Sequence, residues 1–134
     1  KKIHLKEALP SGAVFSVDLT KMIICIKNVL QNAFKYGDSA KGVRVLIGLS
    51  QKNYKIEIQD FGPGILDEDR DHVFESFYRA SGSKKISGFG LGLAISKKII
   101  QAHGGAIALK NRDDVPGCTF VIDLPVIIGD KNDK

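Results

Sequence analysis

The chain has 134 residues, of which 43% are hydrophobic and 26% charged, and its formal net charge is +5. This is the composition of one globular domain and excludes a disordered chain, and no apolar run reaches the roughly 20 residues that span a bilayer. Because the basic residues are scattered and not interleaved with aromatic residues, we expect no nucleic-acid partner.

The two cysteines, Cys25 and Cys118, lie far apart and among apolar neighbours. We expect both to be small buried hydrophobes in a reducing, cytoplasmic environment, since the paired Cys or His spacing of a zinc site is absent from the sequence. The chain starts with Lys1 and carries no signal-peptide pattern. We interpret it as a piece of a longer protein, with a domain over residues 1–125 and a flexible tail over 126–134.

The first half of the chain predicts strands around one long helix. Residues 3–9 and 13–17 are predicted to be short strands joined by a turn at residues 10–12. A helix is predicted from its N-cap Asp18 to Gly37, because apolar residues recur at helical spacing. These residues are Leu19, Met22, Ile23, Ile26, Val29, Leu30, Ala33 and Phe34. Residues 43–49 and 53–60 then predict an antiparallel pair of strands.

The second half predicts two helices and a closing hairpin. Residues 67–78 indicate a short helix, residues 80–88 a mobile loop rich in Gly and Ser, and residues 90–102 an apolar helix stopped by two glycines. Residues 105–111 and 117–124 predict the hairpin. The order of elements favours an α+β fold, a two-layer α/β sandwich. Its mixed, mostly antiparallel sheet would be covered on one face by about three helices.

The long helix carries amides and a lysine away from its apolar face. At about 100° per residue, Asn28, Asn32 and Lys35 cluster on the side opposite to the apolar residues, with Tyr36 at the edge of the cluster. An Asn carbonyl oxygen suits Mg²⁺ that is also held by phosphates, and a lysine suits phosphate charge. Two Asn are unusual for an outer face because they are poor helix formers, but a solvated outer face remains the alternative for this helix alone.

The second predicted strand pair ends in a carboxylate. Asp60 shares strand parity with Ile56 and Ile58, so we expect it to face the core, where an unpartnered carboxylate is costly. The amine of a purine could supply a donor. Gly62 and Gly64 lack Cβ atoms and can bring their backbone close to a flat ring. The alternative is an ordinary Asp turn after a strand.

A glycine run precedes the last helix. Residues 88–92, Gly-Phe-Gly-Leu-Gly, leave free N–H groups at a helix start, which favours an anion site. The spacing is neither that of a dinucleotide fingerprint nor that of a Walker A loop. Arg79, Lys84 and Lys85 could cover a phosphate chain if the loop closes over it. A flexible basic surface loop is the alternative.

In this order, the segments resemble the catalytic and ATP-binding domain of sensor histidine kinases. That domain has the Bergerat-type fold of the superfamily shared with gyrase, Hsp90 and MutL ATPases. Residues 28–36 resemble the N box, 60–64 the G1 box, 73–79 the F box and 88–95 the G2 box. His-Gly-Gly at 103–105 and residues 117–125 are similar to the closing hairpin of the family. The resemblance covers nearly the whole chain.

The resemblance implies which residues surround Mg²⁺ and ATP. Asn32 would hold Mg²⁺ and Asp60 would bond the adenine amine, while Asn28, Lys35 and Arg79 would act at the phosphates. The implied nucleotide site consists of Asn28, Asn32, Lys35, Tyr36, Asp60, Gly62, Gly64, Ile65, Arg79, Lys84, Lys85, Gly88, Phe89, Gly90, Leu91, Gly92, Leu93 and Thr119.

The resemblance also implies a phosphotransfer reaction. ATP-hydrolysing relatives carry a glutamate base at the position of Asn28, and a neutral amide cannot take a proton from water. The domain is therefore expected to hydrolyse ATP poorly. It would instead transfer the γ-phosphate to a histidine on a separate dimerisation domain, for relay to a response regulator.

The chain's own histidines do not fit the role of phosphoacceptor. None of His4, His72 and His103 lies in an acceptor-like motif, and His103 ends a helix, where a cation would complement the dipole. We expect an isolated monomer that cannot phosphorylate itself, from a homodimeric parent that could be a membrane-anchored sensor.

Two further classes stay open at this point. They are a protein-serine kinase of the anti-sigma-factor type and a regulatory nucleotide-binding module without catalysis. The F box and His-Gly-Gly favour the histidine-kinase branch.

Overall fold

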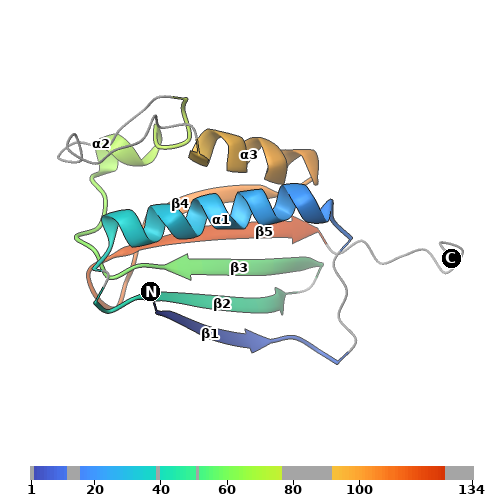
Figure 1. Cartoon of the computed structure of the whole chain (residues 1–134), viewed down its shortest axis with the longest axis horizontal. Coiled ribbons are helices and arrows are strands. Elements are labelled where there is room, and N and C mark those ends of the chain that lie inside the picture. Colours follow the sequence, from blue (N-terminus) through green and yellow to red (C-terminus); the bar gives the residue numbers. More distant parts are fainter. Residues whose placement is uncertain (1, 12–15, 39, 51, 77–91, 126–134) are drawn as a thin grey trace, which may run out of the picture.

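One sheet of five strands and a layer of helices on one of its faces make up the structure (Figure 1). The computed structural model describes residues 2–11, 16–38, 40–50, 52–76 and 92–125. The elements in chain order are β1 (Ile3–Ala8), α1 (Leu19–Tyr36), β2 (Val43–Ser50), β3 (Asn53–Gln59), α2 (Asp67–Arg70), α3 (Gly92–Ala102), β4 (Ala106–Asn111) and β5 (Cys118–Pro125).

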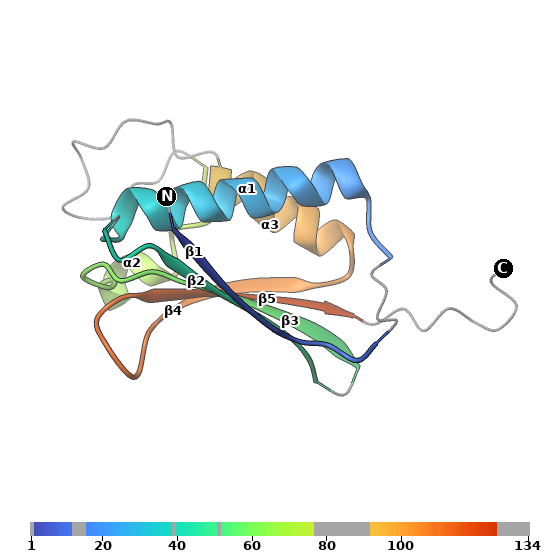
Figure 2. The same ribbon diagram turned by 60° about the horizontal axis from the view of Figure 1, so that its bottom comes forward.

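The strand order in the sheet is β1-β2-β3-β5-β4. β1 pairs with β2 in parallel, and the other three pairs are antiparallel. Figure 2 shows that α1 and α3 lie on the same side of the twisted sheet. The predicted α+β sandwich is therefore confirmed, as are the predicted strand pairs β2–β3 and β4–β5.

The predicted strand over residues 3–9 is present as β1, whereas the predicted strand over 13–17 falls mostly outside the described residues and is not seen in its described part. β1 pairs with β2, so that Ile3 and Leu5 lie beside Val43 and Val45. Val17 lies in a bend, and residues 12–15 are outside the described part of the chain. The Pro-Ser-Gly turn signal is local, whereas β1 pairs with a strand distant in sequence, and its Ile3 and Leu5 side chains stay 50% and 64% exposed.

The predicted helix over 67–78 is too long. α2 ends at Arg70, and the chain continues through hydrogen-bonded turns from His72 N–H to Asp69 O and from Glu75 N–H to His72 O. The turns let Phe74 pack edge-on against Phe120, with the two ring centroids 6.4 Å apart. Packing on the sheet thus overrides the helical spacing of the apolar residues here.

The ends of α1 are as predicted. The Asp18 carboxylate accepts a hydrogen bond from Lys21 N–H (3.1 Å), which caps the helix. Gly37 N–H donates to Ala33 O at the other end.

The buried side of α1 differs from the prediction. Its buried residues are Met22, Cys25, Val29 and Ala33, whereas the predicted core residues Leu19 and Ile23 are 68% and 56% exposed. Because α3 packs beside α1, the buried arc is displaced toward α3 and leaves the opposite flank of the helix uncovered.

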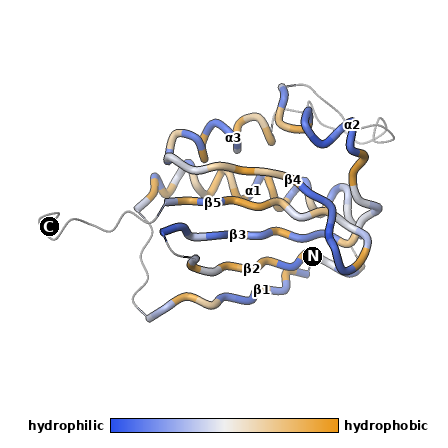
Figure 3. Tube along the Cα trace, turned by 180° about the vertical axis from the view of Figure 1, so that it is seen from behind, coloured by the Kyte–Doolittle hydropathy of each residue, from blue (hydrophilic) through white to orange (hydrophobic). Residues whose placement is uncertain are grey.

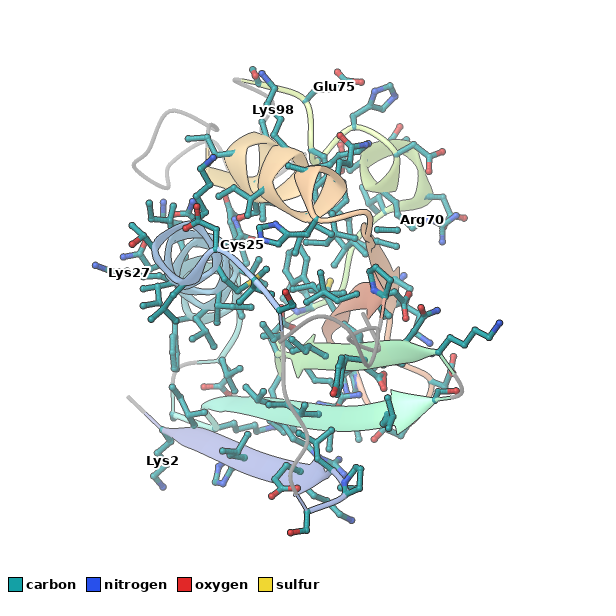
Figure 4. The ribbon with its side chains drawn as sticks, turned by 90° about the vertical axis from the view of Figure 1, so that its right-hand side faces the viewer. Lys2, Cys25, Lys27, Arg70, Glu75 and Lys98 are labelled. Atoms are coloured by element: carbon teal, nitrogen blue, oxygen red, sulfur yellow. The ribbon has the colours of Figure 1, made fainter. Side chains whose placement is uncertain are left out.

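A buried pair of reciprocal contacts joins the two long helices. Ser96 Oγ donates to Cys25 O (3.1 Å), and Cys25 Sγ lies 3.7 Å from Ser96 O. In Figure 4, Cys25 points from α1 toward the interior, whereas Lys27 points away from it. The expectation that Cys25 is a small buried hydrophobe is confirmed.

The far ends of the same helices meet through His103. Asp18 N–H donates to His103 Nε2 (2.9 Å), and His103 Nδ1 lies 2.8 Å from Ile99 O. When Nε2 accepts from Asp18 N–H, Nδ1 is the nitrogen that donates to Ile99 O, so these two contacts together use the tautomer with the proton on Nδ1.

The core lies between the helices and the sheet. Alternate residues of β2, β3, β4 and β5 point toward the helices and are buried, and Figure 3 shows the alternation of hydropathy along the strands. These residues are Val43, Val45, Tyr54, Ile56, Ile58, Ile107, Leu109, Cys118, Phe120, Ile122 and Leu124. Within the described residues, none of the helices has the length and apolar character to cross a membrane.

The junction between α3 and β4 gives a stability prediction. A Cβ atom at Gly105 would lie 2.2 Å from Asp123 O, a backbone atom that cannot move freely, whereas a Cβ at Gly48 in β2 would meet nothing within 4 Å. We expect Gly105→Ala to lower the free energy of unfolding by about 1–3 kcal/mol or more, and Gly48→Ala to change it by less than about 0.5 kcal/mol. Urea denaturation followed by circular dichroism measures both, and equal effects would contradict the packing described.

Candidate functional site

Three elements meet along the C-terminal half of α1. The loop after β3 packs against the last turn of α1, where a Cβ on Gly62 would lie 2.4 Å from Tyr36 O. The start of α3 meets the middle of α1, because Asn28 Nδ2 donates to Gly92 O (3.3 Å). The described parts of the three predicted motifs are therefore adjacent in space, although they are far apart in sequence.

Asp60 is the central acidic group of this region. It is 4% exposed, on the inward side with Ile56 and Ile58, as its strand parity predicts. Its Oδ1 accepts hydrogen bonds from Gly62 N–H (3.0 Å) and Cys118 N–H (2.8 Å). The described residues supply no hydrogen bond to Oδ2. The carboxylate is thus fixed through one oxygen and has the other to accept from a ligand.

The two asparagines of α1 lie beside the core and not opposite to it. Asn28 and Asn32 are half-buried, and each lies about 100° from a fully buried neighbour, Val29 or Ala33. The predicted opposite placement is wrong because the buried arc of α1 reaches round toward α3. Both asparagines are on the flank nearest to α3, where Asn28 bonds Gly92.

The glycines of the β3–α2 loop approach other backbone closely. Gly62 lies against Tyr36 O, and Gly64 adopts φ +90°, where its Cβ would be 2.7 Å from Asn111 Oδ1. The sequence predicts close approach of these glycines to a flat ring. The structure shows a further reason for glycine at these two positions, since any side chain would push the loop away from α1 and from the β4–β5 hairpin.

The β4–β5 hairpin holds this loop through residues that the sequence does not reveal. Asn111 Oδ1 accepts from Ile65 N–H (2.7 Å), and Asn111 Nδ2 donates to Ile65 O (2.9 Å). Arg112 Nη1 donates to Asp60 O (3.1 Å), and its Nε and Nη2 bond both carboxylate oxygens of Asp114. A polar hairpin turn gives no sign in the sequence that its side chains reach back to a loop some 50 residues earlier.

The Cys118 thiol lies in the same buried environment. Burial, together with the nearby negative charge of Asp60, raises its pKa to about 12. Burial also raises the pKa of the Cys25 thiol. Because the thiolate is the reactive form, we assign neither cysteine a nucleophilic role.

Other predicted site residues lie around this centre. Lys35 is exposed in the last turn of α1, Tyr36 is half-buried beside Gly62, and Leu93 is buried in the first turn of α3. Ile65 is held by Asn111.

Thr119 is not brought together with the other site residues. It is buried on the helix-free side of the sheet, where it lines a cavity of about 270 Å³ with Arg44 and Gln59. Strand alternation turns Cys118, and not Thr119, toward Asp60.

Several predictions fall outside the described residues. They concern Arg79, Lys84, Lys85, Gly88, Phe89, Gly90 and Leu91, the loop over 80–88, and the tail over 126–134. Within the described ranges, no group of three or more His, Cys, Asp or Glu side chains is placed to hold a metal ion.

Comparisons with known proteins agree with this arrangement. The sequence model of one family, described as histidine kinase-, DNA gyrase B-, and HSP90-like ATPase, matches residues 17–128. The signal transduction histidine-protein kinase ArlS of Staphylococcus aureus is 38% identical over 134 residues, which cover 90% of this chain and 30% of ArlS. The chain thus spans about a third of the length of that relative.

Solved structures show the same similarity. The mycobacterial sensor histidine kinase MprB superposes with a TM-score of 0.75 and 34% identity, over 92% of this chain and 83% of that one. The catalytic domain of histidine kinase ThkA has a TM-score of 0.73 over 92% of this chain and 80% of that one. At 24% identity, the ThkA match concerns the fold alone.

The Arg112–Asp114 pair gives a prediction for pH dependence. The bidentate guanidinium lowers the Asp114 pKa from 3.8 to about 2. Because the folded-state value is depressed, the pair stabilises the fold fully above pH 3.8, and this stabilisation is lost as the pH falls to about 2. We expect wild type to withstand more urea than Asp114→Asn near neutral pH, and the difference to vanish over that acid range. Asp113→Asn, which alters an exposed neighbour, serves as control. A difference that is constant with pH would contradict the assignment.

Proposed function

The chain belongs to the family of histidine kinase-, DNA gyrase B- and HSP90-like ATPases, as an ATP-binding catalytic domain of the sensor histidine kinase type, and from that premise we propose its reaction. It transfers the γ-phosphate of ATP to a histidine on a separate dimerisation domain of its parent protein, and the phosphate then passes to a response regulator. The parent is a homodimer, and this domain faces the cytoplasm, where ATP is available.

The observation that carries the proposal is the half-satisfied carboxylate of Asp60. A buried carboxylate is costly unless it is hydrogen-bonded, and Asp60 accepts two backbone N–H groups through Oδ1 alone. The exocyclic amine of adenine has the hydrogen that Oδ2 can accept. Asp60 therefore selects adenine over a purine that carries an oxygen at that position.

The flank of α1 nearest to α3 holds the phosphate end of the nucleotide. Asn32 offers an amide oxygen there, which suits Mg²⁺ that takes its other ligands from phosphates and water. When bound, Mg²⁺ supplies charge neutralisation at the phosphates. Lys35 lies one turn further along the helix, and we retain the predicted phosphate contacts of Arg79, Lys84, Lys85 and the glycines of residues 88–92 as part of the proposal.

Asn28 explains why the phosphate is kept for a protein acceptor. Its amide cannot serve as a general base for water, so transfer to water is slow. Its Nδ2 is used to bond Gly92 O at the start of α3. Catalysis then depends on positioning and on charge neutralisation, as phosphoryl transfer generally does.

The first test replaces Asp60 by Asn. Asparagine keeps an oxygen for the N–H groups of Gly62 and Cys118 and puts a donor in place of the free acceptor. We expect ATP affinity, measured by calorimetry, to fall roughly 10- to 100-fold, as for loss of a hydrogen bond to a charged group. Glu57→Gln removes a negative charge from the helix-free face of β3, opposite to the buried side of Asp60, and should bind as wild type. Wild-type affinity in Asp60→Asn would refute the adenine contact.

The second test concerns the acceptor. The chain, mixed with the dimerisation domain of its parent and Mg-ATP, should produce acid-labile phosphohistidine on that domain and none on His4, His72 or His103. Asn28→Asp, which loses the donor to Gly92 O, should reduce the rate at least tenfold if Asn28 orders the start of α3. Acid-stable phosphoserine on a partner would instead indicate the serine-kinase alternative, and ATP binding without any transfer would indicate a regulatory module.

A further inference from the structure

We propose that Arg112 and Asn111 are positioning residues for adenine recognition, because they fix the β3–α2 loop so that the free oxygen of Asp60 meets the base. The inference rests on the role proposed for Asp60. It gives a function to Asn111 and Arg112 of the β4–β5 hairpin, to which the sequence motifs assign none.

Arg112 is buried in a way that is unusual for a charged residue in a hairpin turn. Its side chain is 2% exposed, and its guanidinium lies 4.7 Å from the centre of the Phe61 ring. Its Nη1 donates to Asp60 O, while Nε and Nη2 each donate to one carboxylate oxygen of Asp114. Asp114 thus neutralises and orients the guanidinium, and the guanidinium holds the main chain of Asp60.

Backbone contacts at the start of β5 also hold Asp60. Asp60 N–H donates to Cys118 O (2.9 Å), and Cys118 N–H donates to Asp60 Oδ1 (2.8 Å). Gly117 adopts φ +145°, and a Cβ there would lie 2.3 Å from Asp60 O. The carbonyl, the N–H and one carboxylate oxygen of Asp60 are therefore all held by the hairpin, which determines where Oδ2 points.

Asn111 fixes the other end of the loop. Its amide forms two hydrogen bonds with the main chain of Ile65, one as acceptor and one as donor. The Gly62 backbone between the two clamps lies against Tyr36 O of α1. A loop held at both ends keeps its geometry before the ligand arrives, which lowers the entropy lost on binding.

Arg112 acts through Asp60 and not by contact with phosphate. It lines the cavity on the helix-free side of the sheet with Arg44 and Lys110, whereas Asp60 is buried on the helix side. An arginine on this side of the sheet cannot neutralise a nucleotide bound against α1 and α3. The competing interpretation is that Arg112 and Asp114 only stabilise the hairpin.

Base selectivity separates these interpretations. A stability effect weakens all nucleotides alike, whereas a misplaced Asp60 loses affinity mainly for a base with an amine. We would measure ATP and GTP binding by calorimetry for wild type, Arg112→Ala, Arg112→Lys and Asn111→Ala, at a temperature where circular dichroism shows each to be folded. Lys110→Ala, which removes a neighbouring cation from the same cavity, is the matched control.

We expect Arg112→Ala and Asn111→Ala each to weaken ATP binding roughly fivefold or more and to reduce the preference for ATP over GTP, with Lys110→Ala unchanged. Arg112→Lys should retain part of the ATP affinity and part of the preference for ATP over GTP, since one ammonium donor can still reach Asp60 O. In an Asp60→Asn background, Arg112→Ala should cost less than twofold further, because the group it positions is gone.

Equal losses for ATP and GTP, or an undiminished effect of Arg112→Ala in the Asp60→Asn background, would overturn the positioning role. If Asp60→Asn loses selectivity while Arg112→Ala keeps it, this inference fails and the proposed function stands. If Asp60→Asn itself binds ATP as wild type does, the adenine contact fails, and the positioning role fails with it.

Discussion

The structure depends on one buried carboxylate being held at the place where β3 ends. The Asp60 side chain is almost completely buried. Two backbone N–H groups that donate to one of its oxygens offset the free-energy cost of removing the carboxylate from water. One donor comes from Gly62 within its own loop, and the other comes from Cys118 at the start of β5. The second donor exists only because β5 lies beside β3 in the sheet. The sheet order, in which β5 lies beside β3, thus helps to hold the carboxylate that we propose as the adenine contact.

The helix layer is built on a similar dependence between distant segments. α1 and α3 are joined by Ser96 and Cys25 in the middle, by Asn28 and Gly92 near the site, and by His103 and Asp18 at the far end. These contacts use backbone carbonyls and N–H groups as well as side chains. They fix the rotation of α1 about its axis, so that both asparagines of the N box lie on the flank nearest to α3.

Local patterns predict much of this fold, and contacts between distant segments account for the remainder. The N-cap Asp18, the stop at Gly37 and the inward parity of Asp60 are properties of a few consecutive residues, and the structure agrees with each of them. The partner of β1 and the flank of α1 that is left exposed depend on elements distant in sequence.

The hairpin residues Asn111 and Arg112 could not be found from spacing for the same reason. Their side chains act on main chain some 50 residues away, and main-chain partners leave no side-chain signature in a sequence. Thr119 shows the complementary case, since strand alternation turns it away from Asp60 while its neighbour Cys118 faces the site.

The residue at position 28 joins the structural and chemical arguments. Its Nδ2 donates to the carbonyl of Gly92. A carboxylate at this position would place a second acceptor beside that carbonyl, so the hydrogen bond could not form. The packing of α1 on the start of α3 therefore favours an amide at the position where hydrolysing relatives are expected to have a base. The same hydrogen bond that orders the helices thus excludes the group that would activate water. The slow hydrolysis that we propose would then need no additional device in this domain, because it would follow from how the two helices are joined.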